Sequence, residues 1–152
     1  MITTDLPRNP KKRNPPKQIL VTQSSFSDGP LTVTEDDTEL VISENITFNF
    51  DQPKELVSPN HLGFFAGIVI GASRVTIRLN GKTVRMHPNF RARQRAFSLV
   101  SLDVTPFPPG VMGFDTEPKS PSDICILGPG CLGLTSHFAI HGNTLKEGRI
   151  LI

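Results

Sequence analysis

Short apolar segments that could form strands recur along the second half of the chain. This recurrence restricts the possible folds of the chain more than any other sequence feature. Val75, Ile124 and Ile150 lie in such segments and are separated by 49 and 26 positions. Half of the longer gap ends near Leu99-Val100, inside another apolar segment. The spacing therefore predicts strands near residues 75, 99, 124 and 150 with a repeat of about 25 residues, as in proteins built from stacked repeats.

Each predicted unit combines an alternating strand, a turn of small residues and a long return. Turns at Asn80-Gly81 and at residues 128–130 follow two of the strand candidates. We therefore predict an all-β fold, a short right-handed parallel β-helix with an extended N-terminal arm, in which inward side chains stack on those of neighbouring turns. An Asn-Gly pair also suits a two-residue hairpin, and an antiparallel β-sandwich with coincidental spacing is the alternative fold.

The composition favours short strands over helices. The chain of 152 residues contains 14 prolines and 12 glycines, so roughly one residue in six interrupts regular structure. Residues 31–33 and 46–50 alternate between polar and apolar side chains, as in half-buried strands. Asp36-Asp37 is predicted to form a turn between them.

A basic, proline-rich arm, residues 1–20, precedes the β-helix-like domain, residues 21–152. The arm carries five basic residues and one acidic residue, a net charge of +4, whereas the rest of the chain has 11 basic and 13 acidic residues. Proline-rich composition favours an extended backbone without internal hydrogen bonds. A solvated tail and an arm laid across a partner protein both fit this pattern. The arm residues expected to contact a partner are Arg8, Lys11, Lys12, Arg13 and Lys17.

Two further segments are candidate contact regions. Arg91, Arg93 and Arg95 form a basic cluster, which predicts either a solvated loop or a contact patch, because arginine is enriched at interfaces. A strand candidate follows Gly148-Arg149, and the open end of a repeat stack normally needs a cap. We expect proline-rich loops, a partner protein or further sequence to cover it. Its residues are Ile150, Leu151 and Ile152.

The sequence shows no pattern of catalytic or metal-binding residues. His137 and His141 are four positions apart, and in an extended chain their side chains would stand roughly 13 Å apart, too far for one metal ion. Cys125 and Cys131 have no second pair, so structural thiols are expected in place of a zinc site. Neither a glycine-rich phosphate loop nor a nucleophile elbow is present. We therefore expect no enzyme activity, no cofactor and no small-molecule substrate.

Targeting segments and net charge restrict the expected location of the chain and its possible partners. The first residues lack the apolar core of a signal peptide, and no apolar run approaches the roughly 20 residues of a transmembrane segment. We expect synthesis in the cytoplasm and reduced cysteines. Because the body is mildly acidic, nucleic acid is not favoured as a partner, although the arm and the arginine cluster leave a salt-dependent contact as a lesser hypothesis.

Three segments resemble the early turns of right-handed, pectate-lyase-like parallel β-helix proteins encoded by large DNA viruses of algae and amoebae. They are RVTIRLNGKTV (74–84), QRAFSLVSLDVTPF (94–107) and GCLGLTSHFAIHGN (130–143). The resemblance implies a minor capsid protein in the virion, made in the host cytoplasm, that contacts other capsid or structural proteins. It supplies no catalytic residues. A carbohydrate-binding or carbohydrate-active β-helix fragment is the alternative function.

Overall fold

The computed structural model describes residues 15–49, 64–93, 96–102, 121–133 and 138–141, which form short strands and two short helices. The predicted arm ends inside the first strand, which begins at Lys17. In chain order the elements are β1 (Lys17–Val21), η1 (Gln23–Phe26), β2 (Leu31–Val33), β3 (Thr38–Ile42), β4 (Ile46–Phe48), β5 (Phe64–Ile70), β6 (Thr76–Arg78), β7 (Thr83–Met86), α2 (Pro88–Arg93), β8 (Ala96–Ser101), β9 (Cys125–Leu127), β10 (Cys131–Gly133) and β11 (Phe138–His141).

The strands form three sheets, and every neighbouring pair within the described residues is parallel. Sheet A has the order β1-β3-β6-β9, sheet B the order β11-β8-β5-β2, and sheet C the order β10-β7-β4. Parallel strands need a crossover and cannot be joined by a tight hairpin. The all-β prediction is confirmed for this part of the chain, and the alternative antiparallel sandwich is wrong for it.

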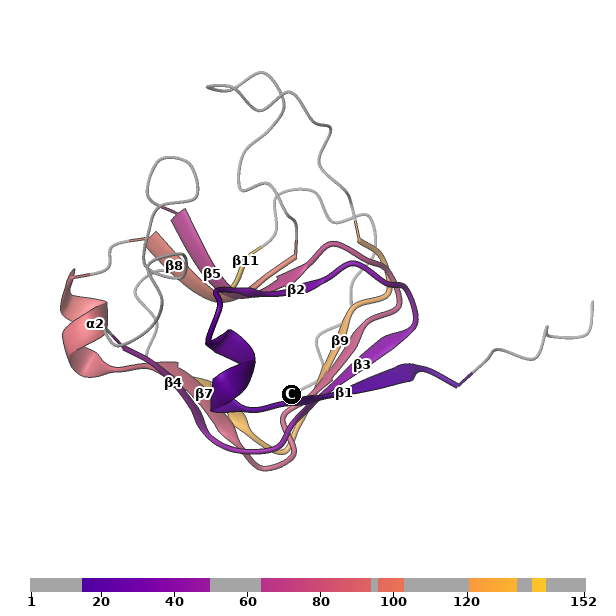
Figure 1. Cartoon of the computed structure of the whole chain (residues 1–152), viewed down its shortest axis with the longest axis horizontal. Helices are drawn as coiled ribbons and strands as arrows, with labels where there is room; N and C mark the ends of the chain where they lie inside the picture. The colour runs from indigo at the N-terminus through magenta and orange to yellow at the C-terminus, as the bar shows by residue number, and fades with distance from the viewer. Residues whose placement is uncertain (1–14, 50–63, 94–95, 103–120, 134–137, 142–152) are drawn as a thin grey trace, which may run out of the picture.

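The chain visits the sheets in a regular sequence, which we describe as four passes. The first pass runs β1–η1–β2, and the later passes run β3–β4–β5, β6–β7–β8 and β9–β10–β11. Each later pass adds one strand to sheet A, then one to sheet C, then one to sheet B. Figure 1 shows the sheets around a common interior, with sheet B at the top and sheet A at the lower right.

The repeat of about 25 residues is wrong for the strands that the structure describes. Thr76 of β6 pairs with Cys125 of β9, so the segments near residues 75 and 124 are neighbours in sheet A, 49 positions apart. The segment near residue 99 is β8, which lies in sheet B between β5 and β11. Half of the gap between Val75 and Ile124 therefore predicted a strand that belongs to sheet B and not to sheet A. The segment near residue 150 lies outside the described residues.

The turn at Asn80-Gly81 is confirmed, but it does not form a hairpin. Both residues have positive φ, 51° and 74°, and the Lys82 N–H donates to the Leu79 carbonyl (2.8 Å). The strands on either side, β6 and β7, belong to sheets A and C. The left-handed backbone that Asn and Gly tolerate thus turns the chain from one sheet into the next.

Each sheet contributes a column of aliphatic side chains to one core. Full burial of each such side chain stabilises the fold by about 1.5–3 kcal/mol. Members on the inner strands are fully buried, whereas four on the outermost strands are only partly buried: Ile19, Leu31, Leu132 and Ile140. The columns are Ile19-Leu40-Ile77-Ile126 in sheet A, Leu31-Ile68-Val100-Ile140 in sheet B and Ile46-Val84-Leu132 in sheet C.

The η1 helix covers the core at the first pass, where sheet C has no strand (Figure 1, indigo). Its Phe26 is fully buried and meets Phe48 edge to face, with ring centroids 5.1 Å apart. Gln23 Oε1 accepts the Thr47 N–H of β4 (2.8 Å), so a side chain satisfies a backbone donor at the edge of sheet C. A Cβ at Gly67 would overlap the Phe48 ring, and glycine there makes room for it.

Candidate protein-contact surface

Among the described residues, the outer edge of β1 has backbone groups without a partner strand. β1 ends sheet A in the described part of the chain, with β3 on its other side. The Lys17 N–H donates to the Asp37 carbonyl (2.9 Å) and the Val21 carbonyl accepts the Ser43 N–H (3.0 Å), so alternate residues from Lys17 face β3. The N–H and C=O groups of Gln18 and Leu20 therefore point away from the sheet, where an added strand could bind them.

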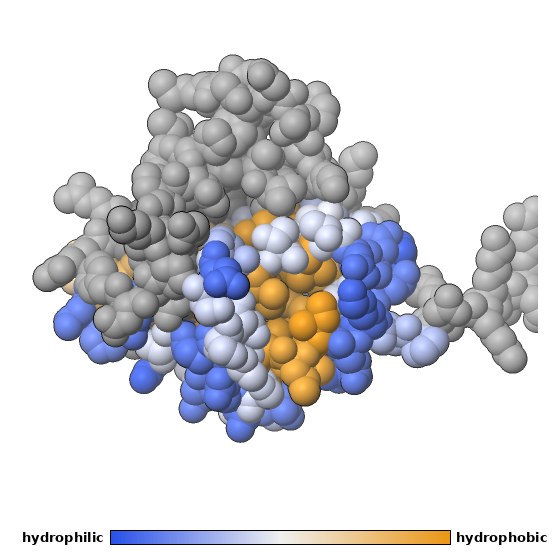
Figure 2. Space-filling view, viewed as in Figure 1, coloured by the Kyte–Doolittle hydropathy of each residue, from blue (hydrophilic) through white to orange (hydrophobic). Residues whose placement is uncertain are grey.

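Apolar side chains lie next to this edge. Leu20 is 69% exposed, and it is the one exposed large hydrophobic residue among those whose side-chain burial the structure describes. Ile19 and Leu31, on the two strands of the first pass, are only partly buried. Figure 2 shows an apolar area in the middle of the face that Figure 1 presents, with hydrophilic surface to its left and right. An apolar area beside an unpaired strand edge is typical of a protein-contact surface. We call Gln18, Ile19, Leu20 and Leu31 the β1 surface.

A buried carboxylate lies beside the β1 surface. Glu39 of β3 is 5% exposed, and it accepts hydrogen bonds from Gln18 Nε2 (2.5 Å) and from the Arg78 guanidinium, with which it forms an ion pair. Arg78 remains half exposed, so the pair lies at the surface of sheet A. The Arg78 hydrogen bond, followed by that of Gln18, holds the pKa of Glu39 below its ordinary value of 4.5, against the opposing effect of burial. Through these hydrogen bonds the Glu39 carboxylate links β1, β3 and β6, the first three strands of sheet A.

We expect Glu39 to make stability depend on acidity. Because its pKa is lower in the folded chain than in the unfolded chain, its contribution is present above pH 4.5 and is lost as the pH falls through the folded value. The urea midpoint of the wild type should therefore fall on acidification from about pH 5 to pH 2, and that of Glu39→Gln should fall less. Arg78→Gln, which removes the main cause of the low pKa, should flatten the same part of the curve. Parallel curves for all three proteins would contradict this role.

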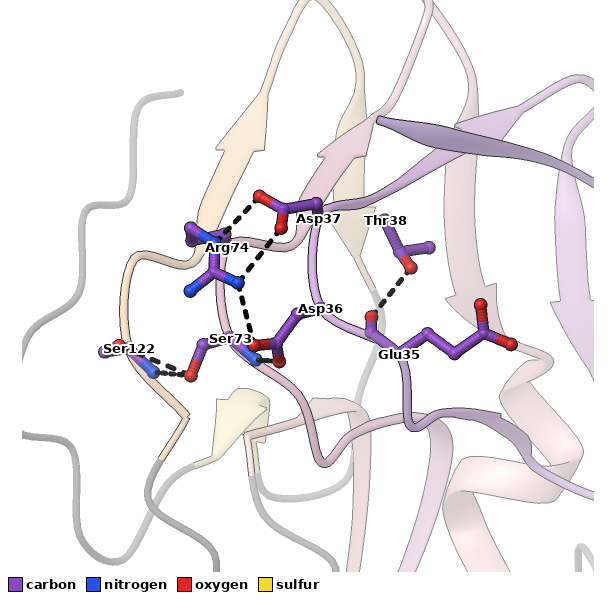
Figure 3. A network of polar contacts seen from close by, with 7 residues as sticks. All are labelled: Glu35, Asp36, Asp37, Thr38, Ser73, Arg74 and Ser122. Atoms are coloured by element: carbon purple, nitrogen blue, oxygen red, sulfur yellow. Dashed lines mark hydrogen bonds and ion pairs between the residues drawn. The ribbon is translucent and has the colours of Figure 1, made fainter. Parts of the chain in front are cut away.

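A polar network joins three passes at the corner that leads into sheet A (Figure 3). Arg74 donates from Nε to Asp37 (2.7 Å) and from Nη2 to Asp36 (2.8 Å), and these hydrogen bonds, that of Asp37 first, raise the pKa of Arg74 above its ordinary value. The Ser73 N–H donates to Asp36 (2.9 Å), and Ser73 Oγ accepts the Ser122 N–H (3.1 Å). The network is half exposed, so its ion pairs contribute little to stability and its main effect is to align the passes.

The same corner repeats a left-handed backbone. Asp37, Arg74 and Asp123 each have φ of 56° and each stand just before a strand of sheet A. The Asp37 N–H donates to the Ser73 carbonyl (3.2 Å), and the Arg74 N–H donates to the Ser122 carbonyl (2.8 Å), so the three corners stack. Aspartate tolerates this conformation well, whereas arginine adopts it rarely. The predicted turn at Asp36-Asp37 is the first of these corners.

The structure describes only some of the predicted contact residues. Lys17 is the first residue of β1, and its Nζ pairs with Glu35 (2.9 Å) at the surface. Arg91 lies exposed on α2, and Arg93 ends that helix, which replaces the loop predicted there. Lys17 therefore lies on the strand that carries the β1 surface, next to Gln18. The remaining residues lie outside the described ranges: Arg8, Lys11, Lys12, Arg13, Arg95, Ile150, Leu151 and Ile152.

The residues considered for metal binding do not form a described site. Within the described ranges, no three His, Cys, Asp or Glu side chains gather to hold a metal ion. Cys125 is half-buried and Cys131 is exposed, and both are free thiols. His141 ends β11, and His137 lies outside the described residues. Neither η1 nor α2 has the length and apolar character that a membrane-spanning helix requires.

Reasoning from sequence missed the β1 surface. The segment KQILV was divided between the arm and the body, although Ile19 and Val21 share one strand face and Gln18 and Leu20 the other. The paired prolines before it, Pro15-Pro16, mark where a strand can begin. The alternation of side chains in KQILV was the sequence signal that could have located this strand. Comparisons with protein-family models, curated proteins and solved structures gave no match.

Proposed function

We propose that the chain is a short right-handed parallel β-helix that acts as a non-catalytic structural component of a larger protein assembly, a minor capsid protein of a large viral shell. The parallel pairing and the regular order of the passes support the β-helix. The resemblance of residues 74–84, 94–107 and 130–143 to viral β-helix proteins supports the capsid role.

The observation that carries the proposal is the β1 surface. A single strand edge combines unpaired backbone groups, an exposed Leu20 and the partly buried Ile19. Edges of this kind are normally shortened, charged or covered, because they pair with other chains. A protein partner would satisfy the backbone groups and remove the apolar side chains from water together. The mechanism is therefore contact by strand addition at the outer edge of β1.

Sedimentation of assembled particles tests this role. Particles purified from cells that produce the chain should contain it in a fixed ratio to the major shell protein, as measured by quantitative mass spectrometry across a density gradient. Leu20→Asp should reduce the particle-bound fraction roughly tenfold or more, because a charge replaces an apolar contact of about 1.5–3 kcal/mol.

The matched control for this test is Thr32→Asp. Thr32 is exposed on β2, at the edge of sheet B, so its replacement adds the same charge to the first pass without changing the β1 surface. The particle-bound fraction of this variant should match that of the wild type. Recovery of the wild-type chain only as a free protein would overturn the proposal, and specific binding or cleavage of a glycan by the purified chain would favour the carbohydrate alternative.

A further inference from the structure

Within the part of the chain that the structure describes, two residues of β1 have backbone groups free to bind a further strand. Gln18 and Leu20 point away from β3, as the hydrogen bonds of Lys17 and Val21 establish. The next outward residue, Thr22, is already used, because its N–H donates to Ser25 Oγ (3.0 Å) and its carbonyl accepts the Ser25 N–H (3.1 Å). The edge thus offers two donors and two acceptors, placed symmetrically about Ile19.

This arrangement is complementary to itself. In an antiparallel pair of two β1 strands centred on Ile19, Gln18 of each copy stands opposite Leu20 of the other. Residues that stand opposite with both backbone groups facing each other exchange two hydrogen bonds. All the free backbone groups of Gln18 and Leu20 are then satisfied in both copies. A parallel partner strand would lack this symmetry.

We propose that β1 pairs antiparallel with β1 of a second copy of this chain, so that sheet A continues from one copy into the other across a twofold axis at Ile19. The inference rests on the proposed structural function and identifies one partner in it. Ile19 meets Ile19 of the second copy in a non-hydrogen-bonded pair, in which side chains approach most closely. The aliphatic column of sheet A is thereby continued into the second copy, and the two Leu20 side chains become diagonal neighbours on the outer face.

Charge also favours the antiparallel direction. In this pair Lys17 of each copy stands opposite Val21 of the other. In a parallel pair in the same register, the Lys17 side chains of the two copies would lie side by side, with like charges adjacent.

Disulfide trapping tests the predicted register. In a full-length chain with Cys125→Ser and Cys131→Ser, Ile19→Cys should form a covalent dimer under mild oxidation. Cβ atoms in such a pair are about 4.5–5.5 Å apart, near the separation that a disulfide needs. Leu20→Cys is the matched control, because diagonal positions are about 7–8 Å apart and should cross-link at least roughly tenfold more slowly. A mixture of Gln18→Cys and Leu20→Cys chains should form the mixed dimer.

Analytical ultracentrifugation provides the second measurement. The wild-type chain should dimerise below about 0.1 mM, and Leu20→Asp should raise the dissociation constant roughly tenfold or more while Thr32→Asp leaves it unchanged. A wild-type chain that stays monomeric, or an Ile19→Cys chain that cross-links no faster than Leu20→Cys, would overturn the pairing. A monomer that is still incorporated into particles would overturn only this inference and leave the proposed function standing.

Discussion

Replacement of Phe48 by alanine should lower the free energy of unfolding by about 3–5 kcal/mol. The Phe48 ring is fully buried, and it packs edge to face against Phe26 of η1 and against the backbone at Gly67. The truncation therefore leaves a cavity and also loosens the helix that covers the first pass. Since single domains are stable by only about 5–15 kcal/mol, this variant should be close to unfolding at 25 °C. Urea denaturation followed by circular dichroism measures the loss.

The control for Phe48→Ala is Leu20→Ala, measured at a concentration where the chain is monomeric. Leu20 is 69% exposed, so its truncation should change the free energy of unfolding by less than about 0.5 kcal/mol. Phe26→Ala should cost nearly as much as Phe48→Ala, and the double variant less than their sum, because the two rings share one contact. Equal stability of Phe48→Ala and the wild type would contradict the described core.

Replacement of Gly130 by alanine should cost about 3 kcal/mol or more. Its φ of 152° lies in a region that residues with a Cβ rarely adopt. A Cβ there would also stand 2.7 Å from the Lys82 carbonyl oxygen and overlap the Leu79 side chain. The Lys82 carbonyl and the Leu79 side chain cannot move without a further loss of stability, because that carbonyl oxygen accepts the Cys131 N–H (2.9 Å) and Leu79 is buried in the core.

Gly81→Ala separates backbone strain from overlap. Gly81 also has positive φ, 74°, but a Cβ there would meet no atom within 4 Å. Its replacement should cost about 1–2 kcal/mol for the left-handed backbone, partly offset by lower entropy of the unfolded chain. Urea unfolding of both variants measures the difference. An equal loss in the two variants would mean that the fourth pass at Gly130 is not packed against Leu79 and Lys82 of the third pass as described.

Strand positions were largely predictable from sequence. Alternation located residues 31–33 and 46–48, as well as the strands around Ile77 and Ile126, because inward and outward side chains differ in polarity. The segment TELVI of β3 was missed. Its Glu39 is buried on the outer face by Gln18 and Arg78, so the strand lacks a plain polar-apolar pattern.

The pairing of strands was less predictable, because the lengths of the passes differ. Along sheet A, Lys17 pairs with Thr38, Glu39 with Thr76, and Thr76 with Cys125, at separations of 21, 37 and 49 positions. A fixed period cannot detect such a series. The β1 surface was missed for a related reason, since the free backbone groups of Gln18 and Leu20 depend on which side of β1 receives β3, and the alternation of side chains does not show that side.

The stacking of successive passes has a consequence for how the chain reaches its folded state. No strand in the described ranges can find its partner in a nearby hairpin, because the smallest separation between paired residues is 21 positions. Forming any of these strand pairs therefore requires the closure of a long loop, whose entropy cost comes before the free energy gained by pairing. Chains dominated by such remote contacts fold slowly. During synthesis, the strand edges of each folded pass would stay unpaired until the next pass had been made. In that interval they could pair with a folded strand of a neighbouring molecule.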